Sequence, residues 1–322
     1  MKVFIAGATG VLGRRVVKQL VAGGHQVLGL SRSAENADWL AQNGAQARTG
    51  DLFNAAQVGE LSAGCDAILH LATAIPTKTR TSRGDWAIND RIRREGTQAL
   101  LQAAVSHHCR VYVQQSVTFL YGEHGDDWVD ESTPVAAEPG SLLESSLDME
   151  QAVARAAKDQ GLPAVTLRFG QFYCYDSAQT RSILQSARRG QFPIMGPGDA
   201  YWSQIQVDDA AAAVVSALEH PAQANGLTPN VTYNVVDDQP ARYRDVATFI
   251  AQALGARPPM RLPVALARLL VGSATVGSLT TSTRVRNQRL KDELGWRPVY
   301  PTYREGYREV IAEARMKEER RK

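Results

Sequence analysis

The sequence predicts an α/β fold: a doubly wound parallel sheet with a smaller C-terminal cap. Three observations predict it. Short apolar runs alternate with helical patterns along residues 1–120, a glycine-rich turn joins the first run to the first helix, and the composition changes after Phe169. Strands separated by helices of this length pair in parallel through right-handed crossovers.

Each expected element has its own local reason. The expected strands are short runs of β-branched and other apolar residues, and the expected helices repeat apolar residues three and four positions apart. The strands are expected at Val3–Ile5, Gln26–Leu30, Ala67–Leu71, Val111–Gln115, Ala164–Phe169 and Thr232–Val236. The helices are expected near Gly10–Ala22, Ala34–Asn43, Asn89–His107 and Leu147–Lys158.

The turn after the first strand contains three glycines whose spacing suits a bound phosphate. Gly7 lets the chain turn sharply off the strand, Gly10 removes a Cβ where a pyrophosphate approaches the backbone, and Gly13 lets the helix pack close to the sheet. The phosphates then meet unpaired backbone N–H groups at the positive end of the helix dipole. This order of strand, turn and helix is typical of a Rossmann-type dinucleotide-binding unit. The other turn residues expected beside the phosphates are Thr9, Val11 and Leu12.

The composition divides the chain into a dinucleotide-binding domain and a cap. Residues 171–205 carry clustered glycines and aromatic residues, and the prolines within 256–302 indicate short elements instead of another parallel unit. We therefore expect residues 1–170 to form the dinucleotide-binding domain and residues 206–255 to return to it. Residues 171–205 and 256–322 are expected to form the cap and a C-terminal helix, over the sheet edge where ligands bind in open α/β folds.

Composition and charge limit the classes of function. Lysine and arginine number 36 against 33 acidic residues, so the net charge of +3 gives no argument for a nucleic-acid partner. No apolar stretch approaches the ~18 residues of a membrane span, and no signal peptide precedes the first strand, so we expect a cytoplasmic protein. Cys65, Cys109 and Cys174 lack the spacing of metal ligands, and each is expected to be a small buried hydrophobe or a free thiol. No bound metal is expected.

The glycine spacing, G-x-x-G-x-x-G, resembles that of the short-chain dehydrogenase/reductase superfamily, specifically its extended branch of NAD(P)-dependent epimerases and dehydratases. The resemblance covers nearly the whole chain. Besides the glycines, it rests on Gly50-Asp51-Leu52, His70-Leu71-Ala72, Gly96-Thr97, Ser116, Tyr121-Gly122, Leu167-Arg168 and Val207-Asp208-Asp209. The resemblance implies that the last two aspartates cap a helix and do not bind a metal.

The end of the second strand favours NADP(H) over NAD(H). An NAD-preferring domain carries Asp or Glu there to bind the adenosine ribose, whereas Ser31 occupies the place here and Arg32 offers a guanidinium to a 2′-phosphate. NAD is the alternative if Arg32 is an ordinary surface charge. The other residues that the resemblance places at the cofactor are Asp51, Leu52, Leu71, Ala72, Thr73, Arg93, Gln114, Phe169 and Gln171.

The catalytic pair that members of this superfamily usually carry is missing. In those proteins a Tyr-x-x-x-Lys pair exchanges a proton with the substrate, and the Lys ammonium lowers the tyrosine pKa. The matching positions here hold Leu142 and Ser146, and neither side chain can do this chemistry. The chain therefore resembles an atypical member of the branch. The candidates left near the nicotinamide are Ser116 (preferred over Thr118), Tyr121 and Tyr173, with Arg93 as a clamp for an anion or an oxygen.

These features predict an NADP(H)-dependent oxidoreductase acting on a carbonyl, alcohol or activated double bond of a small molecule, with a non-standard proton donor. Aromatic residues of the cap, such as Tyr175, Tyr201 and Trp202, favour a substrate other than a sugar nucleotide. Two alternatives stay open: a non-redox NAD(P)-binding sensor or interaction protein, and an epimerase or dehydratase with tightly held cofactor. We expect no nucleic-acid or membrane partner, and either a monomer or a homodimer.

Overall fold

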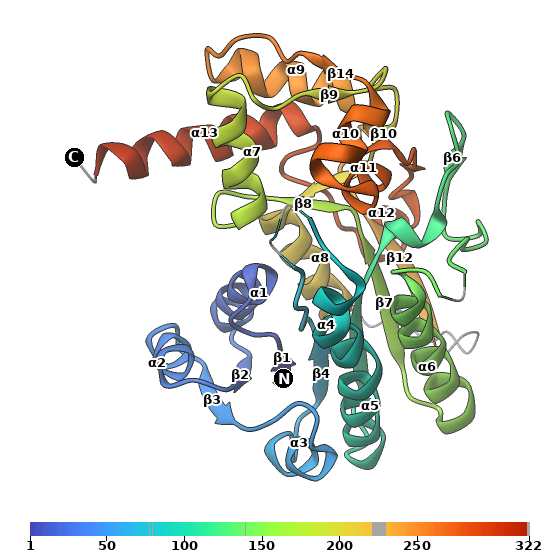
Figure 1. Ribbon diagram of the computed structural model, residues 1–322. Helices are drawn as coiled ribbons and strands as arrows, with labels where there is room; N and C mark the ends of the chain where they lie inside the picture. The colour runs from blue at the N-terminus through green and yellow to red at the C-terminus, as the bar shows by residue number, and fades with distance from the viewer. Residues whose placement is uncertain (77, 79, 139, 221–229, 321–322) are drawn as a thin grey trace.

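The protein folds around one seven-stranded parallel sheet (Figure 1). The computed structural model describes residues 1–76, 78, 80–138, 140–220 and 230–320. The strands of the sheet are β1 (Lys2–Ala6), β2 (Gln26–Ser31), β3 (Gln46–Thr49), β4 (Ala67–His70), β5 (Val111–Val117), β7 (Ala164–Phe169) and β12 (Asn230–Val235). Their order is β12-β7-β5-β4-β1-β2-β3, and every neighbouring pair is parallel. The chain thus winds outward from β1 in both directions, which confirms the predicted Rossmann-type α/β fold.

Helices cover both faces of the sheet because successive side chains of a strand point to opposite faces. In β1, Val3 and Ile5 join one core cluster, and Phe4 and Ala6 join the other. The first cluster includes residues of α1 (Val11–Ala22), α2 (Ala34–Gln42), α8 (Val207–Glu219) and α12 (Gln288–Leu294). The second includes residues of α3 (Ala55–Leu61), α5 (Thr97–Ser106) and α6 (Glu144–Gln160).

One expected helix, Asn89–His107, is divided in the structure. A short 3-10 turn, η1 (Arg83–Trp86), leads into α4 (Ala87–Arg91), which continues through a π-helical turn, η2 (Ile92–Gly96), into α5. π-helical turns are rare and are frequently found at functional sites. η2 packs against α6, the helix that lacks the expected catalytic pair.

Within residues 1–76, two elements have no counterpart among the predicted ones: β3 and α3. β3 is an edge strand whose residues are half-buried or exposed, so it lacks the apolar run of an inner strand. α3 has seven residues, and Val58 is its fully buried side chain. α6 begins at Glu144, ahead of the expected start at Leu147. Each difference arises where few apolar side chains mark the element.

The cap lies over the carboxyl ends of the strands, at the top of Figure 1. Its core cluster joins α7 (Ala178–Arg188), α9 (Tyr243–Ala253) and α13 (Tyr303–Glu319). The packing differs from the division by composition in two places. α9 lies in the cap although residues 206–255 are predicted to return to the sheet, and α12 packs with the sheet although residues 256–322 are predicted to complete the cap. The remaining cap elements are β8 (Gln171–Tyr173), β9 (Ile194–Met195), β10 (Tyr201–Trp202), β11 (Gln204–Gln206), β13 (Ala241–Arg242), β14 (Arg261–Leu262), α10 (Val264–Val271) and α11 (Ser273–Thr280).

The segment after β5 ties the sheet to the last third of the chain. It holds a 3-10 turn, η3 (Thr118–Tyr121), and a short strand, β6 (Trp128–Val129), which pairs with β15 (Arg284–Val285). The cysteines are all buried and free, as expected for small apolar side chains. Within the described ranges, no helix combines the length and apolar content needed to cross a membrane.

Candidate functional site

The three glycines of the turn after β1 meet different constraints. Gly7 has a φ of +88°, and a Cβ there would lie 2.5 Å from the Ala72 nitrogen; a Cβ on Gly13 would lie 2.0 Å from the Gly7 carbonyl oxygen. Both positions need glycine because neighbouring backbone leaves no room for a side chain. A Cβ on Gly10 would meet only that carbonyl oxygen, at 3.4 Å. Gly10 therefore leaves space outside the turn, where a pyrophosphate approaches in such folds.

The start of α1 presents backbone donors to the same space. Gly10 is the N-cap, no side chain caps the helix, and its first turn carries no acidic residue. The first N–H groups of a helix have no partner within the helix and attract anions. Val11 and Leu12 are the first two residues of α1, so their backbone N–H groups are among those without a partner within the helix. The uncapped helix start and the open face of Gly10 together fit a pyrophosphate.

The end of β2 carries positive charge and no carboxylate. Ser31 is buried and donates its hydroxyl to a backbone carbonyl 3.0 Å away, whereas Arg32 is exposed and forms no ion pair with a described residue. A second arginine, Arg14, escaped the sequence analysis. Its Nε donates to the Thr9 carbonyl at 2.9 Å, and its guanidinium lies 4.5 Å over the ring of Trp39, on the helix that follows Arg32. The sequence signal that could have identified Arg14 is its position directly after the third glycine.

The segment after β4 borders this turn, and the segment after β3 holds two further residues predicted at the cofactor. Asp51 is exposed, and one of its carboxylate oxygens, Oδ1, accepts a hydrogen bond from the Phe53 N–H at 3.0 Å, which leaves Oδ2 for a ligand. Leu52 is buried, so its side chain packs in the core. Residues 71–73 follow β4 directly beside Gly7 and become more exposed toward Thr73. Contacts from these residues to a cofactor stay predictions.

Ser116 belongs to a buried ion-pair network. Its hydroxyl donates to the Glu150 carboxylate at 2.5 Å, and Arg168 donates to both oxygens of the same carboxylate, at 3.0 and 2.6 Å. With its proton directed at Glu150, Ser116 cannot donate it to a substrate in this arrangement. Thr118 is 4% exposed and forms no side-chain hydrogen bond with a described residue. The structure therefore favours Thr118 over Ser116 as the hydroxyl at the end of β5.

The two candidate tyrosines are enclosed in the protein. Tyr121 is 0% exposed, and its hydroxyl donates to Asn234 Oδ1 at 2.9 Å. Tyr173 is 1% exposed, and its ring stacks on Tyr307 of α13 at 4.5 Å. Burial raises the pKa of both phenols. This packing argues against the predicted proton-donor role of either residue, because a general acid must reach the substrate.

Gln114, Phe169 and Gln171 are also predicted at the cofactor, and the structure places them in different surroundings. Gln114 is buried and satisfied within the protein, since its Oε1 accepts from the Tyr112 hydroxyl and its Nε2 donates to the Gln115 carbonyl, both at 2.9 Å. Phe169 is 1% exposed and packs in the core of the sheet. The side chains of Gln114 and Phe169 therefore do not face a ligand. Gln171 is half-buried, and its contact with a cofactor stays a prediction.

Arg93 lies in the π-helical turn η2. In space, this turn contacts α6 and the His70 side chain at the end of β4. It is 6% exposed, and its Nη1 donates to Ser145 Oγ at 3.3 Å; Ser145 in turn donates to Asp90 at 2.7 Å. Burial lowers the pKa of Arg93 to about 10, although Asp90 acts in the opposite direction. Beside it, Ser146 is fully buried with no hydrogen-bond partner for its Oγ among the described residues, and Leu142 is 38% exposed. A guanidinium therefore stands next to the place where the family's lysine is missing.

The aromatic residues of the cap form its core instead of a substrate pocket. Trp202 stacks on Tyr243 at 4.4 Å, and Phe192 meets the same ring edge-on at 5.9 Å. The packing of Trp202 and Phe192 therefore gives no support to the prediction of a substrate other than a sugar nucleotide. Arg188 pairs with Glu318, so it is not free to bind a diphosphate.

The two aspartates at the start of α8 do not act as the predicted capping pair. The side chain of Gln206 caps the helix, accepting from the Asp208 N–H. The Asp209 carboxylate instead accepts hydrogen bonds from the Val299 and Tyr300 N–H groups, at 2.8 and 2.9 Å. Asp209 thus holds the segment that leads into α13, a role that only the folded chain reveals.

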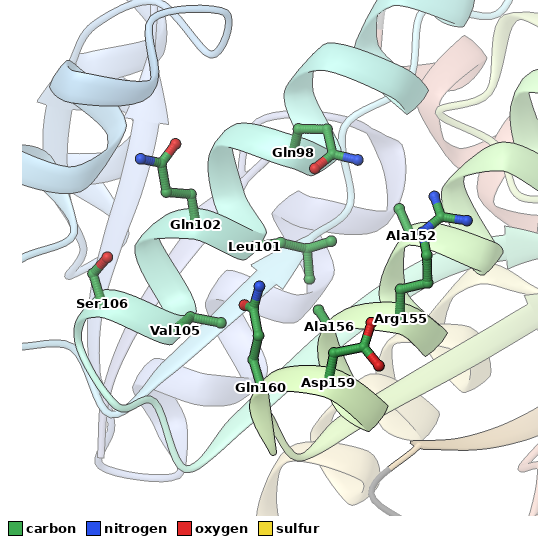
Figure 2. Close-up of a pocket in the computed structure, with 10 residues that line it drawn as sticks. All are labelled: Gln98, Leu101, Gln102, Val105, Ser106, Ala152, Arg155, Ala156, Asp159 and Gln160. Carbon is green, nitrogen blue, oxygen red and sulfur yellow. The ribbon is translucent and has the colours of Figure 1, made fainter.

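A groove of about 490 Å³ lies elsewhere, between α5 and α6 (Figure 2). Leu101, Ala152 and Ala156 are buried side chains in its lining, and polar residues such as Gln98 and Asp159 surround them. None of the predicted cofactor or catalytic residues lines this groove. The candidate site therefore stays at the carboxyl ends of the strands.

Comparison with known proteins agrees with this geometry. Residues 3–235 match the NAD dependent epimerase/dehydratase family. The chain is 32% identical to a 3-diazoavenalumate denitrifying reductase from a Streptomyces species, over 95% of this chain and 99% of the relative. It is 28% identical to the 2-alkyl-3-oxoalkanoate reductase of Shewanella oneidensis, over 89% and 73%. The crystal structure of human epimerase family protein SDR39U1 with NADPH superposes with a TM-score of 0.78 and 22% identity, covering 97% of this chain and 99% of that one. The glycine turn, the parallel sheet and these matches together show that the chain belongs to the NAD dependent epimerase/dehydratase family.

Proposed function

We propose that this protein is an NADP(H)-dependent oxidoreductase of a small organic molecule, which reduces a carbonyl group or an activated double bond with NADPH or oxidises an alcohol with NADP⁺. The observation that carries the proposal is the pairing of an open glycine turn with positive charge at the end of β2. Gly10 leaves room for a pyrophosphate, Ser31 stands where an NAD-preferring domain has a carboxylate, and the adjacent Arg32 forms no ion pair with a described residue. A guanidinium binds a 2′-phosphate through two parallel hydrogen bonds.

The relatives support the reductase class. Both curated relatives described above are named reductases, and the human structure was determined with NADPH. Near the start of α6, however, Leu142 and Ser146 replace the pair that ordinary members use. The proton that accompanies the hydride must then come from another group.

A bound nicotinamide would supply the hydride, and the chain's own residues would bind and orient the reactants. The backbone of the glycine turn would hold the pyrophosphate, and Arg14 and Arg32 the adenosine end. At the end of β5, the Thr118 hydroxyl is the group not engaged by a described residue, so it is placed to orient a substrate oxygen or a water. Ser116, Glu150 and Arg168 hold β5, β7 and α6 in register beneath it.

Two measurements on the purified protein test the proposal. Fluorescence titration should show tighter binding of NADPH than of NADH, and a screen of oxo compounds and activated alkenes should show consumption of NADPH at the nicotinamide absorbance. Exchange of cofactor between turnovers is expected. Cofactor that stays bound through turnover would favour an epimerase or dehydratase. Cofactor binding without turnover of any class of compound in the screen would favour a sensor.

A further inference from the structure

Arg93 is a buried cation whose own fold gives it no anionic partner. No carboxylate oxygen of a described residue lies within 4.0 Å of its guanidinium, and its hydrogen-bond partner among these residues is the neutral hydroxyl of Ser145. Comparable arginines are paired: Arg168 has Glu150, and Arg15 has both Asp176 and Asp208. A guanidinium carries five donors, and placing it away from water is costly unless they are used.

The nearby carboxylate of Asp90 forms its hydrogen bond with Ser145. Asp90 lies one helical turn before Arg93, and its Oδ1 accepts the Ser145 hydroxyl at 2.7 Å. That bond directs the Ser145 proton toward Asp90 and a lone pair of its oxygen toward Arg93. Ser145 therefore fixes one edge of the guanidinium and leaves the remaining donors to another group.

The surroundings of Arg93 also contain unused polar atoms. Asn89 anchors the segment after β4 by accepting from the Ala74 N–H at 2.9 Å, yet its buried Nδ2 has no partner among the described residues. The Ser146 hydroxyl, next to Ser145, is likewise buried without a partner. Buried donors without partners are uncommon in folded proteins, and a polar ligand or a water molecule bound here would satisfy both.

The backbone places this group beside the start of α6, where the family's catalytic pair is missing. Arg93 stands in the π-helical turn η2, which packs on α6 next to the positions that lack the catalytic pair. Beneath the turn, the buried His70 at the end of β4 donates its Nε2–H to the Ile92 carbonyl at 3.4 Å. A guanidinium with one positive charge and a planar fork of donors matches the charge and shape of one carboxylate.

We propose that Arg93 binds a carboxylate group of the substrate, so that the preferred substrates are organic acid anions. This assignment rests on the proposed reductase function and names the substrate class of the same site. Arg93 does not donate the proton or the hydride; it holds the acid group while the reacting carbon faces the nicotinamide.

The test is a binding comparison on protein saturated with NADP⁺. Benzoate and octanoate are titrated against their neutral analogues benzamide and octanamide by calorimetry. The carboxylates should bind at least tenfold more tightly than the amides. Arg93→Gln should remove this difference, Arg93→Lys should keep part of it, and Arg94→Gln should keep all of it. Arg94 is the matched control because it lies in the same turn but is exposed and paired with Asp148.

NADPH affinity, measured separately, should change less than twofold in each variant that retains the circular dichroism of the parent. The proposal is overturned if the parent protein shows no preference for the carboxylates, or if Arg93→Gln preserves the preference. It is also overturned if Arg93→Gln weakens NADPH as much as it weakens benzoate, because Arg93 would then serve the cofactor. Failure of the parent to bind NADPH at all would instead refute the proposed function.

Discussion

At the residue scale, cofactor choice depends on Arg32. This side chain is exposed and unpaired by described residues at the end of β2, so its removal should not disturb the fold. A charge-assisted hydrogen bond contributes about 1.5–3 kcal/mol, so Arg32→Ala should weaken NADPH roughly ten- to a hundredfold and leave NADH nearly unchanged. Fluorescence titration of both cofactors measures this. Arg110→Ala is the control. Arg110 is also exposed, but it precedes β5 and so lies at the amino-terminal ends of the strands, whereas Arg32 follows β2 at their carboxyl ends. Equal losses for the two cofactors would refute the role of Arg32.

Substitutions at two glycines of the same turn should separate an effect on cofactor binding from an effect on folding. Gly10→Val adds a side chain that points into open space at an ordinary φ, so the protein should fold normally and lose affinity for both cofactors. Gly13→Ala adds a Cβ that would lie 2.0 Å from the Gly7 carbonyl, so this smaller change should destabilise the protein itself. Circular dichroism, thermal unfolding and cofactor titration distinguish the two effects. Retained affinity in Gly10→Val would show that the phosphates bind elsewhere.

At the element scale, one ion pair joins α6 to β7 beneath the site. The Arg168 and Glu150 side chains are 10% and 11% exposed, and Glu150 also accepts the Ser116 hydroxyl of β5. Arg168→Leu should cost about 3–5 kcal/mol in the free energy of unfolding, because it leaves Glu150 buried without its partner. Replacing both residues by leucine should recover much of that loss. Urea denaturation measures each variant. The exposed pair of Arg94 and Asp148 is the control, and Arg94→Ala should cost less than about 1 kcal/mol. A similar small cost for Arg168→Leu would contradict this account.

At the scale of the whole molecule, the stability of the fold should depend on pH through His70. Burial lowers the pKa of this residue to about 4 in the folded protein, against about 6.5 in an unfolded chain. Between these values the unfolded chain binds a proton that the folded protein does not. The stabilisation is therefore complete above about pH 6.5 and is lost as pH falls toward 4. From pH 7 to 4.5 the parent should lose roughly 2–3 kcal/mol more than His70→Gln, as measured by urea denaturation at both pH values. Parallel losses in parent and variant would show that His70 is protonated equally in both states.

The glycine turn, the parallel pairing of the strands and the missing catalytic pair were all predictable from the sequence. Each depends on residues close together in the chain: the glycines sit within one turn, each strand is a single apolar run, and the missing pair spans one turn of helix. Local spacing sets backbone conformation and hydrogen-bond reach, so these features follow without knowledge of the rest of the fold. The edge strand β3 and the π-helical turn at Arg93 lack such a local pattern.

The sequence by itself thus determined the fold class and the position of the glycine turn, and it showed that Leu142 and Ser146 occupy the places of the family's usual catalytic pair. Only the tertiary structure decided which side chains face the site. The Tyr121 hydroxyl meets Asn234, 113 residues further along the chain, and Ser116 meets Glu150, 34 residues away. Arg93 forms no ion pair with a described residue, and the nearby Asp90 accepts a hydrogen bond from Ser145, 55 residues away. A side chain's exposure and partners are set by whichever distant segments pack on it, and no pattern of neighbouring residues encodes that choice.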